Sequence, residues 1–93
     1  MSRRLETIAP GTPVFCGDRR VGSVEGIYTE GDSRLPEYLA VAWDARGVTI
    51  LIRTNDVQSI EQRGVVLQSL DPTTYETTAT FEPRRFPTIK KLN

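Results

Sequence analysis

Short runs of Val, Ile, Thr, Tyr and Trp, each closed by turn residues, recur along the first 70 residues of this 93-residue chain. Runs of this length and composition are typical of β-strands. They leave no room for the crossover helices that a parallel sheet needs. The pattern therefore predicts an all-β fold: a small, six-stranded, antiparallel sheet that curls into a barrel or sandwich. The expected strands lie at residues 12–16, 20–29, 38–43, 48–52, 57–61 and 65–67.

Two turn sequences join the later runs into hairpins. The first is Asp44-Ala45-Arg46-Gly47, where Gly47 is placed to take a left-handed backbone conformation. The second is Gln62-Arg63-Gly64, which precedes the last run. Alternation along the strands selects the side chains expected in the core, which are Val14, Val21, Val24, Ile27, Leu39, Val41, Ile50, Ile52, Val57, Ile60, Val65 and Leu67.

The composition excludes several chemistries. The chain has no His and one Cys, so a Ser-His-Asp triad, a His-ligated metal and an internal disulfide are excluded. Cys16 is expected to be a small buried hydrophobe. Glu30, Asp32 and Glu37 flank a glycine-containing loop that lacks the regular ligand spacing of a calcium site. We therefore expect no enzyme activity, no catalytic residues, no metal, no cofactor and no small-molecule substrate.

Three segments are expected along the chain. Residues 1–10 form an N-terminal extension, residues 11–70 form the β domain, and residues 71–93 form a C-terminal arm with a Thr-rich start and a basic, proline-containing end. Alternation over residues 73–80 favours an added extended strand, because β-branched Thr is a poor helix former. No apolar run approaches the roughly 20 residues that span a bilayer, and no signal peptide is evident, so a cytoplasmic location is expected.

Several motifs follow one another in a characteristic order over residues 11–67. They are Gly11-Thr12-Pro13-Val14, Arg20-Val21-Gly22-Ser23-Val24-Glu25-Gly26-Ile27, Tyr38-Leu39-Ala40-Val41, the step from Ile52 to Val57, and the closing hairpin with Ile60, Val65 and Leu67. In this order they resemble a PRC-barrel domain. The chain departs from the family pattern at Arg53, where the family usually has Pro. Arg53 keeps a backbone N–H and adds a charge.

The resemblance implies a small six-stranded antiparallel PRC-barrel-like barrel, here with an extended C-terminal arm, and a role as a scaffolding module. Related domains occur in the H subunit of photosynthetic reaction centres and in the C-terminal half of a ribosome-maturation factor that contacts a ribosomal protein. The family shares no active-site residues to assign here. The sequence shows neither the membrane helix of the first protein nor the additional barrel of the second, so neither role transfers directly.

Charge is distributed unevenly, although the net charge is zero. Between residues 5 and 82, six Arg oppose twelve Asp and Glu, so this body carries −6. The two ends carry +6, from Arg3, Arg4, Arg84, Arg85, Lys90 and Lys91. A −6 body disfavours phosphate binding over its whole surface. The basic ends suit an acidic protein, nucleic acid or the acidic body of another copy.

The C-terminal arm is the candidate binding segment, because it interleaves apolar and basic side chains. Three arrangements of the arm stay open: packing on its own domain, docking on another chain, and disorder. The candidate residues are Phe81, Arg84, Arg85, Phe86, Ile89, Lys90, Lys91 and Leu92.

These observations favour a non-enzymatic protein-interaction or scaffolding module, which binds a protein partner or another copy of itself through its sheet and its arm. The alternative is an accessory factor in ribosome or RNA metabolism, in which the basic tail contacts phosphate.

Overall fold

The computed structural model describes Leu5 and residues 8–92. Short 3₁₀ helices interrupt or follow the strands, and the described residues include no α-helix, which confirms the prediction of an all-β fold. The strands are β1 (Pro13–Cys16), β2 (Arg19–Glu30), β3 (Tyr38–Trp43), β4 (Val48–Arg53), β5 (Val57–Glu61), β6 (Gly64–Leu67) and β7 (Ile89–Lys91). The 3₁₀ helices are η2 (Thr54–Asp56), η3 (Pro72–Tyr75) and η4 (Pro83–Arg85).

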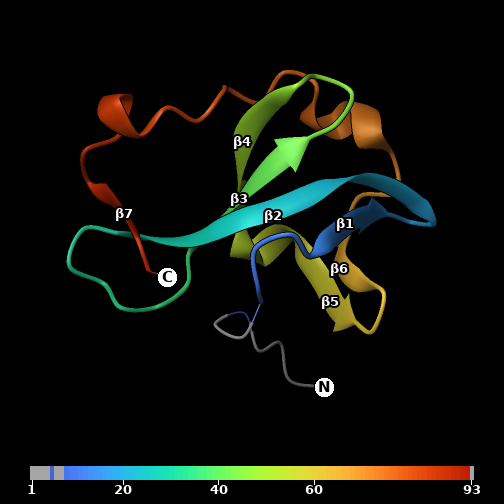
Figure 1. Ribbon diagram of the computed structural model, residues 1–93, viewed down its shortest axis with the longest axis horizontal. Coiled ribbons are helices and arrows are strands. Elements are labelled where there is room, and N and C mark those ends of the chain that lie inside the picture. The colour runs from blue at the N-terminus through green and yellow to red at the C-terminus, as the bar shows by residue number, and fades with distance from the viewer. Residues whose placement is uncertain (1–4, 6–7, 93) are drawn as a thin grey trace.

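The strands form one mixed sheet in the order β4-β3-β2-β1-β6-β5, and β7 adds to β2 (Figure 1). The expected hairpins β3–β4 and β5–β6 are antiparallel. β1 and β6 instead run parallel, with Val14 opposite Val65 and Cys16 opposite Leu67. The prediction of an antiparallel barrel is therefore wrong, because the sheet is mixed and is not closed.

The sheet stays open because its two edge strands, β4 and β5, pair with other segments and not with each other. Thr80 of the C-terminal arm forms a bridge with Ile50 of β4, on the edge where β5 would have to pair to close a barrel. Within the described part of the chain, β5 pairs with β6 alone. The parallel contact needs no crossover helix, because all of β2 to β5 lies between β1 and β6 along the chain.

The core lies on one face of the curved sheet. Every core residue expected from the sequence is buried except Ile60, which is half-buried and packs against the others. The same cluster also takes in Cys16 and Trp43 from the strands, Leu5 and Ile8 from before the first strand, and Tyr75 from the arm. Segments on both sides of residues 11–70 thus contribute to one core.

The Thr-rich stretch is not the extended strand that the alternation predicts. Asp71 accepts a hydrogen bond at 3.0 Å from the Thr73 N–H, and Pro72 occupies the first position of η3. An Asp cap followed by Pro is a strong helix-start signal, and here it outweighs the β preference of Thr. Only Thr80, at the end of the stretch, bridges to the sheet.

The C-terminal arm, residues 71–92, wraps around the sheet. In Figure 1 it runs from η3 past β4 to η4 and descends to β7 beside the far end of β2. β2 is the longest strand, so it pairs with β1 and β3 and still has a free edge at Tyr28–Glu30 for β7.

Candidate interaction surface

The outer face of β3 and β4, opposite the core, carries the candidate site. Along β3, the buried core side chains of Leu39, Val41 and Trp43 alternate with Tyr38, Ala40 and Ala42, which therefore belong to the outer face. Register places Tyr38 opposite Arg53, and Ala40 opposite Leu51. Ala40 is nevertheless only 1% exposed, so a further segment covers this face.

The covering segment is the arm around Phe81. The Phe81 N–H donates to the Thr49 carbonyl of β4 at 2.7 Å, next to the Ile50–Thr80 bridge. Phe81 is 7% exposed, and its ring forms an edge-to-face contact with the Tyr28 ring at a centroid distance of 4.9 Å. Phe86 follows at 5.7 Å from Phe81. Two small Ala residues on the outer face thus leave room for aromatic side chains of the arm.

Arg46 fastens the beginning of the arm. Its Nη1 donates to the carbonyl of Thr78 at 2.6 Å and to that of Tyr75 at 3.2 Å. The Tyr75 ring lies against Trp43 at one end of the core. Burial raises the pKa of the Tyr75 phenol to about 12, with smaller contributions from the negative charges of Asp56 and Cys16. The folded protein therefore favours the neutral, protonated form of the Tyr75 phenol.

The end of the arm is fastened by β7. Its residues pair antiparallel with β2, with Lys91 opposite Tyr28 and Ile89 opposite Glu30. The Leu92 N–H donates to the Ile27 carbonyl at 2.7 Å, and the half-buried Leu92 side chain packs against the core. Of the three arrangements left open by the sequence, the arm adopts packing on its own domain.

An apolar hollow of about 210 Å³ remains between the arm and the outer face. We call it the arm-walled hollow. It is open on one side, and apart from the Tyr38 and Thr78 hydroxyl groups its side chains are hydrocarbon. The residues that line it are Tyr38, Leu51, Thr78, Ala79, Phe81, Phe86 and Ile89.

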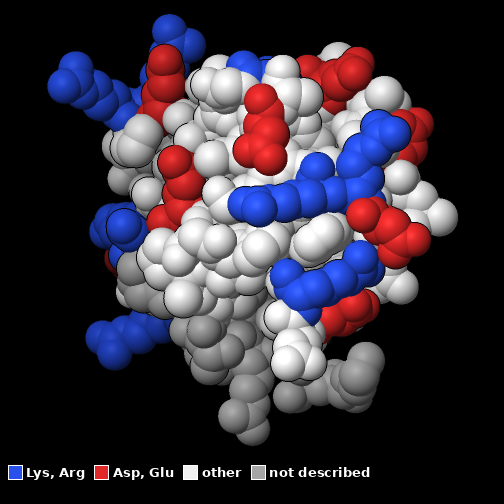
Figure 2. Space-filling view, turned by 45° about the vertical axis from the view of Figure 1, so that its right-hand side comes forward, with Lys and Arg blue, Asp and Glu red and all other residues white. Residues whose placement is uncertain are grey.

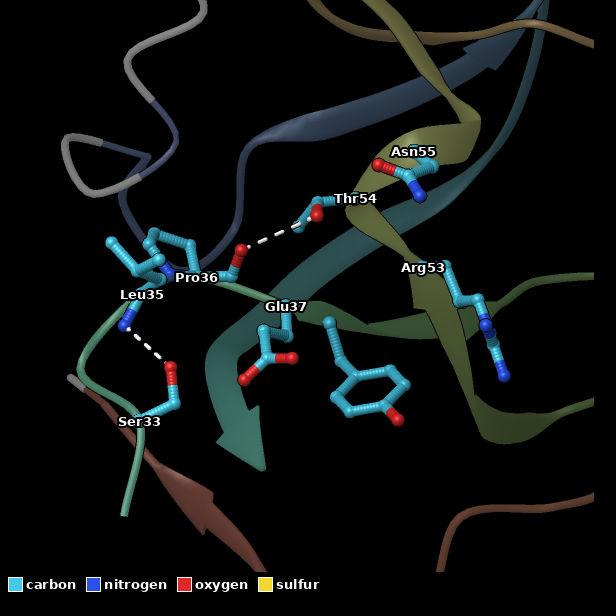
Figure 3. Close-up of a pocket in the computed structure, with 8 residues that line it drawn as sticks. Ser33, Leu35, Pro36, Glu37, Arg53, Thr54 and Asn55 are labelled. Carbon is cyan, nitrogen blue, oxygen red and sulfur yellow. Dashed lines mark hydrogen bonds between the residues drawn. The ribbon is translucent and has the colours of Figure 1, made fainter. Parts of the chain in front are cut away.

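A second, more polar pocket of about 320 Å³ shares Tyr38 with the hollow as a lining residue. Figure 3 shows Leu35 and Pro36 on one side of it and Arg53 and Asn55 on the other. The Thr54 hydroxyl holds the two sides together by donating to the Pro36 carbonyl at 3.3 Å. We call it the Tyr38 pocket.

One row of side chains crosses the outer face from β7 to β4. Register sets Lys91, Tyr28, Tyr38 and Arg53 side by side, so the row has a cation at each end and two phenols between them. At the usual spacing between neighbouring strands, its ends are about 14 Å apart. Arg53, the position that departs from the PRC-barrel pattern, is exposed, and the described residues offer it no ion pair.

The structure does not gather the basic arm residues into one patch. Lys90 and Lys91 point to opposite faces of β7, because side chains alternate along a strand. Arg85 is paired with Glu82 at 2.9 Å, and Arg84 is exposed. Arg3 and Arg4 lie outside the described residues.

The face in Figure 2, where the β1 end of the molecule comes forward, interleaves acidic and basic side chains. Arg63 illustrates the mixing: it contacts Asp18 at 3.4 Å and Glu61 at 3.0 Å, and its guanidinium lies 4.6 Å from the Phe15 ring centre. Two hydrogen bonds hold the pKa of the Glu61 carboxyl group below its ordinary value. The larger effect comes from the Ser59 hydroxyl group, and the next from Arg63. The charges on this face are therefore partly neutralised by one another.

The apolar and the basic candidate residues of the arm lie in different surroundings. Phe81, Phe86 and Ile89 become walls of the hollow, and Leu92 joins the core, so none of these apolar groups is a free anchor. The four basic residues stay exposed. Sequence reasoning missed Tyr38, Leu51, Thr78 and Ala79 as wall residues. The available signal was the pair of small Ala residues on the outer side of the third run, which mark a covered face.

The remaining candidates have ordinary surroundings. Cys16 is 1% exposed, and burial, followed by the charge of Asp71, raises the pKa of its thiol. The Glu37 carboxylate accepts hydrogen bonds from the Glu30 N–H at 3.1 Å and the Thr29 hydroxyl at 3.3 Å. Over residues 5 and 8–92, no three His, Cys, Asp or Glu side chains come together as metal ligands. In the same residues, no helix has the length and apolarity to cross a bilayer.

Comparison with known protein families, with curated proteins and with solved structures found no match for this chain.

Proposed function

We propose that this chain is a non-enzymatic protein-interaction domain whose binding surface is the outer face around Tyr38. The observation that carries the proposal is the arm-walled hollow itself. An apolar hollow bordered by cations suits an apolar side chain of a protein segment that also carries acidic groups. In this proposal the arm builds a wall of the site and does not itself reach out to the partner.

The chemistry of the surface favours protein over phosphate. The hollow offers hydrocarbon, which contributes about 25 cal/mol for each Å² of apolar surface that a partner buries. The exposed cations are dispersed over η4, both faces of β7 and the end of β4. A scaffolding role also fits the resemblance of residues 11–67 to PRC-barrel domains.

Site-specific photo-cross-linking tests the proposal. A photoreactive phenylalanine analogue replaces Leu51 in the hollow or, as the control, Gln58, which is exposed on the distant strand β5. The chain is irradiated in native extract with and without nuclease. We expect a discrete protein adduct, or an adduct between two copies, from position 51 alone. Equal adducts from both positions would contradict the proposal.

The same experiment separates the RNA alternative. A nucleic-acid adduct that nuclease removes, combined with steep loss of binding as salt is raised, would indicate phosphate contacts. Binding through the hollow should instead fall far less with salt than phosphate binding does, because salt screens the contacts of the bordering cations but not the apolar contacts.

Truncating the arm is a poor test of this surface. Removing residues 71–93 also removes Tyr75 from the core and Phe81 from the outer face. Loss of binding would then report unfolding, so single substitutions on the exposed rim are the sharper choice.

A further inference from the structure

Strand β4 contributes one side chain to each of the two recesses that share Tyr38. Leu51 lines the arm-walled hollow, and Arg53 lines the Tyr38 pocket. Burial alternates along β4, so both side chains belong to the outer face, and their Cα atoms are about 6.7 Å apart. The face therefore presents an apolar recess and a cation at the spacing of alternate residues in a strand.

Arg53 is a cation that a partner can neutralise. It is exposed, and the described residues offer it no ion pair. Glu37 also lines the pocket, but its carboxylate accepts a hydrogen bond from the Glu30 N–H at 3.1 Å and lies on the Ser33 side, away from Arg53 (Figure 3). Exposed Arg34, which precedes Leu35 of the pocket wall, adds a second cation to this loop.

Other acidic residues of this region lie away from Arg53. Glu30 ends β2, which β3 separates from β4, and Asp32 is in the loop directly after it. The Glu25 carboxylate accepts a hydrogen bond from the Thr49 hydroxyl, four positions before Arg53 on β4. An acidic group of a partner is therefore attracted at the Arg53 end of β4 and repelled at the Thr49 end.

Resting on the proposed function, we propose that the partner is an extended protein segment with an acidic side chain two residues from a large apolar one. The apolar side chain occupies the arm-walled hollow over Leu51, and the carboxylate pairs with the Arg53 guanidinium. Side chains two positions apart in an extended segment lie on one face with the same spacing as Leu51 and Arg53. At adjacent positions, the carboxylate would point away from the sheet.

Titrating the ¹⁵N-labelled full chain with short peptides tests the charge and the spacing. The probes are acetylated, amidated Ser-Phe-Ser-Glu-Ser and its reversed sequence, because a partner can run along β4 in either direction. One control has Gln in place of Glu, and the other has the same composition with Phe and Glu adjacent. We expect the amide resonances of Leu51 and Arg53 to shift. The better probe should bind about three- to tenfold more tightly than either of its controls, because an exposed carboxylate–guanidinium contact adds modestly to apolar binding.

A substitution of the cation assigns the preference to its residue. Arg53→Gln should abolish the preference for Glu over Gln and leave the shift at Leu51, since an exposed side chain is changed and the hollow is not. Arg19→Gln is the matched control, because Arg19 is exposed at the opposite end of β2 from the Tyr28–Tyr38 pair. It should leave the preference unchanged.

Equal binding of a probe and either of its controls would overturn the proposal. So would an equal loss of preference with Arg19→Gln, or no shift at Leu51 and Arg53 with peptide at about 10 mM. If the preference is absent but a protein cross-links at position 51 and not at position 58, the proposed function stands and only this recognition chemistry is excluded. Equal adducts from positions 51 and 58 would instead count against the proposed function itself.

Discussion

The Tyr75 ring rests on the Trp43 indole, with centroids 5.3 Å apart and ring planes inclined by 53°. Trp43 ends β3 and is 2% exposed, and Tyr75, from η3 in the arm, is 6% exposed. The η3 segment, which lies outside the seven-stranded sheet, therefore closes one end of its core. The arm is part of the folded domain, which has consequences that unfolding experiments can measure.

Tyr75→Ala should lower the free energy of unfolding by about 3 kcal/mol, because large-to-small changes of buried aromatic residues remove apolar contacts and leave a cavity. Urea denaturation followed by Trp43 fluorescence measures the loss. Tyr75→Phe is the control, since it keeps the ring and should cost much less. A stable Tyr75→Ala protein with unchanged fluorescence would contradict the role of this contact.

The same residue predicts an alkaline limit to stability. The folded pKa of Tyr75 is raised from 10.0 to about 12 by burial. Below pH 10 the phenol is protonated in both states, so Tyr75 leaves the free energy of unfolding unchanged. Between pH 10 and 12 the unfolded chain releases the proton first, and the free energy of unfolding should fall by up to about 1.4 kcal/mol per pH unit. Urea titrations at pH 9, 10 and 11 measure this slope. Tyr75→Phe should reduce the slope to the part that the buried Cys16 thiol leaves, because the pKa of that thiol is also raised. Equal slopes in both proteins would refute the assignment.

Arg46→Met should loosen the arm while leaving the sheet intact. The substitution keeps the apolar stem and removes the donors to the Tyr75 and Thr78 carbonyls, at a cost of about 1.5–3 kcal/mol. Amide hydrogen exchange should accelerate at Phe81 and Leu92, whose N–H groups attach the arm. Arg20→Met, on exposed Arg20 of β2, is the control. Uniform acceleration over all strands would instead indicate global destabilisation.

Gly64→Ala should prevent folding or cost at least about 4 kcal/mol. Gly64 has φ +141°, and a Cβ there would lie 2.2 Å from the Pro13 backbone carbonyl oxygen. Gly47→Ala is the matched change in the other hairpin. Gly47 also has a positive φ, +65°, but a Cβ would meet open space, so about 1–2 kcal/mol is expected. Thermal unfolding of both variants gives the comparison, and similar melting temperatures would argue against the close approach of β1 and β6.

Strand positions and most of the core follow from local sequence, because alternation and turn residues act within a few residues of one another. The turn at Gly47 and the buried state of Cys16 are of this kind. The parallel contact of β1 with β6 does not follow from local sequence. Nothing local distinguishes a strand that pairs with the next strand along the chain from one that pairs with a distant segment. Closure into a barrel was wrongly expected for the same reason.

The candidate site could be located in part. The interleaved apolar and basic residues of the arm were predicted to bind a partner, and three of them, Phe81, Phe86 and Ile89, line the hollow on their own domain. Whether such a segment packs on its own domain depends on the shape of the surface that receives it. Here that surface is set by Ala40 on the outer face and by the bridge from Thr80 to Ile50, which depend on tertiary register. The strand predicted over residues 73–80 was wrong for a local reason, because the Asp71-Pro72 helix start outweighed the strand preference of Thr.

The parallel contact between β1 and β6 sets the order in which the chain can fold. Val14 meets Val65 only after a loop of some fifty residues closes, and the entropy of closing a long loop must be offset before the contact stabilises anything. The β3–β4 and β5–β6 hairpins are local and should form first, with β1 acting as the late link between two halves of the sheet. A chain in synthesis therefore has no complete core until its last third has been made, and the high contact order predicts folding in milliseconds to seconds.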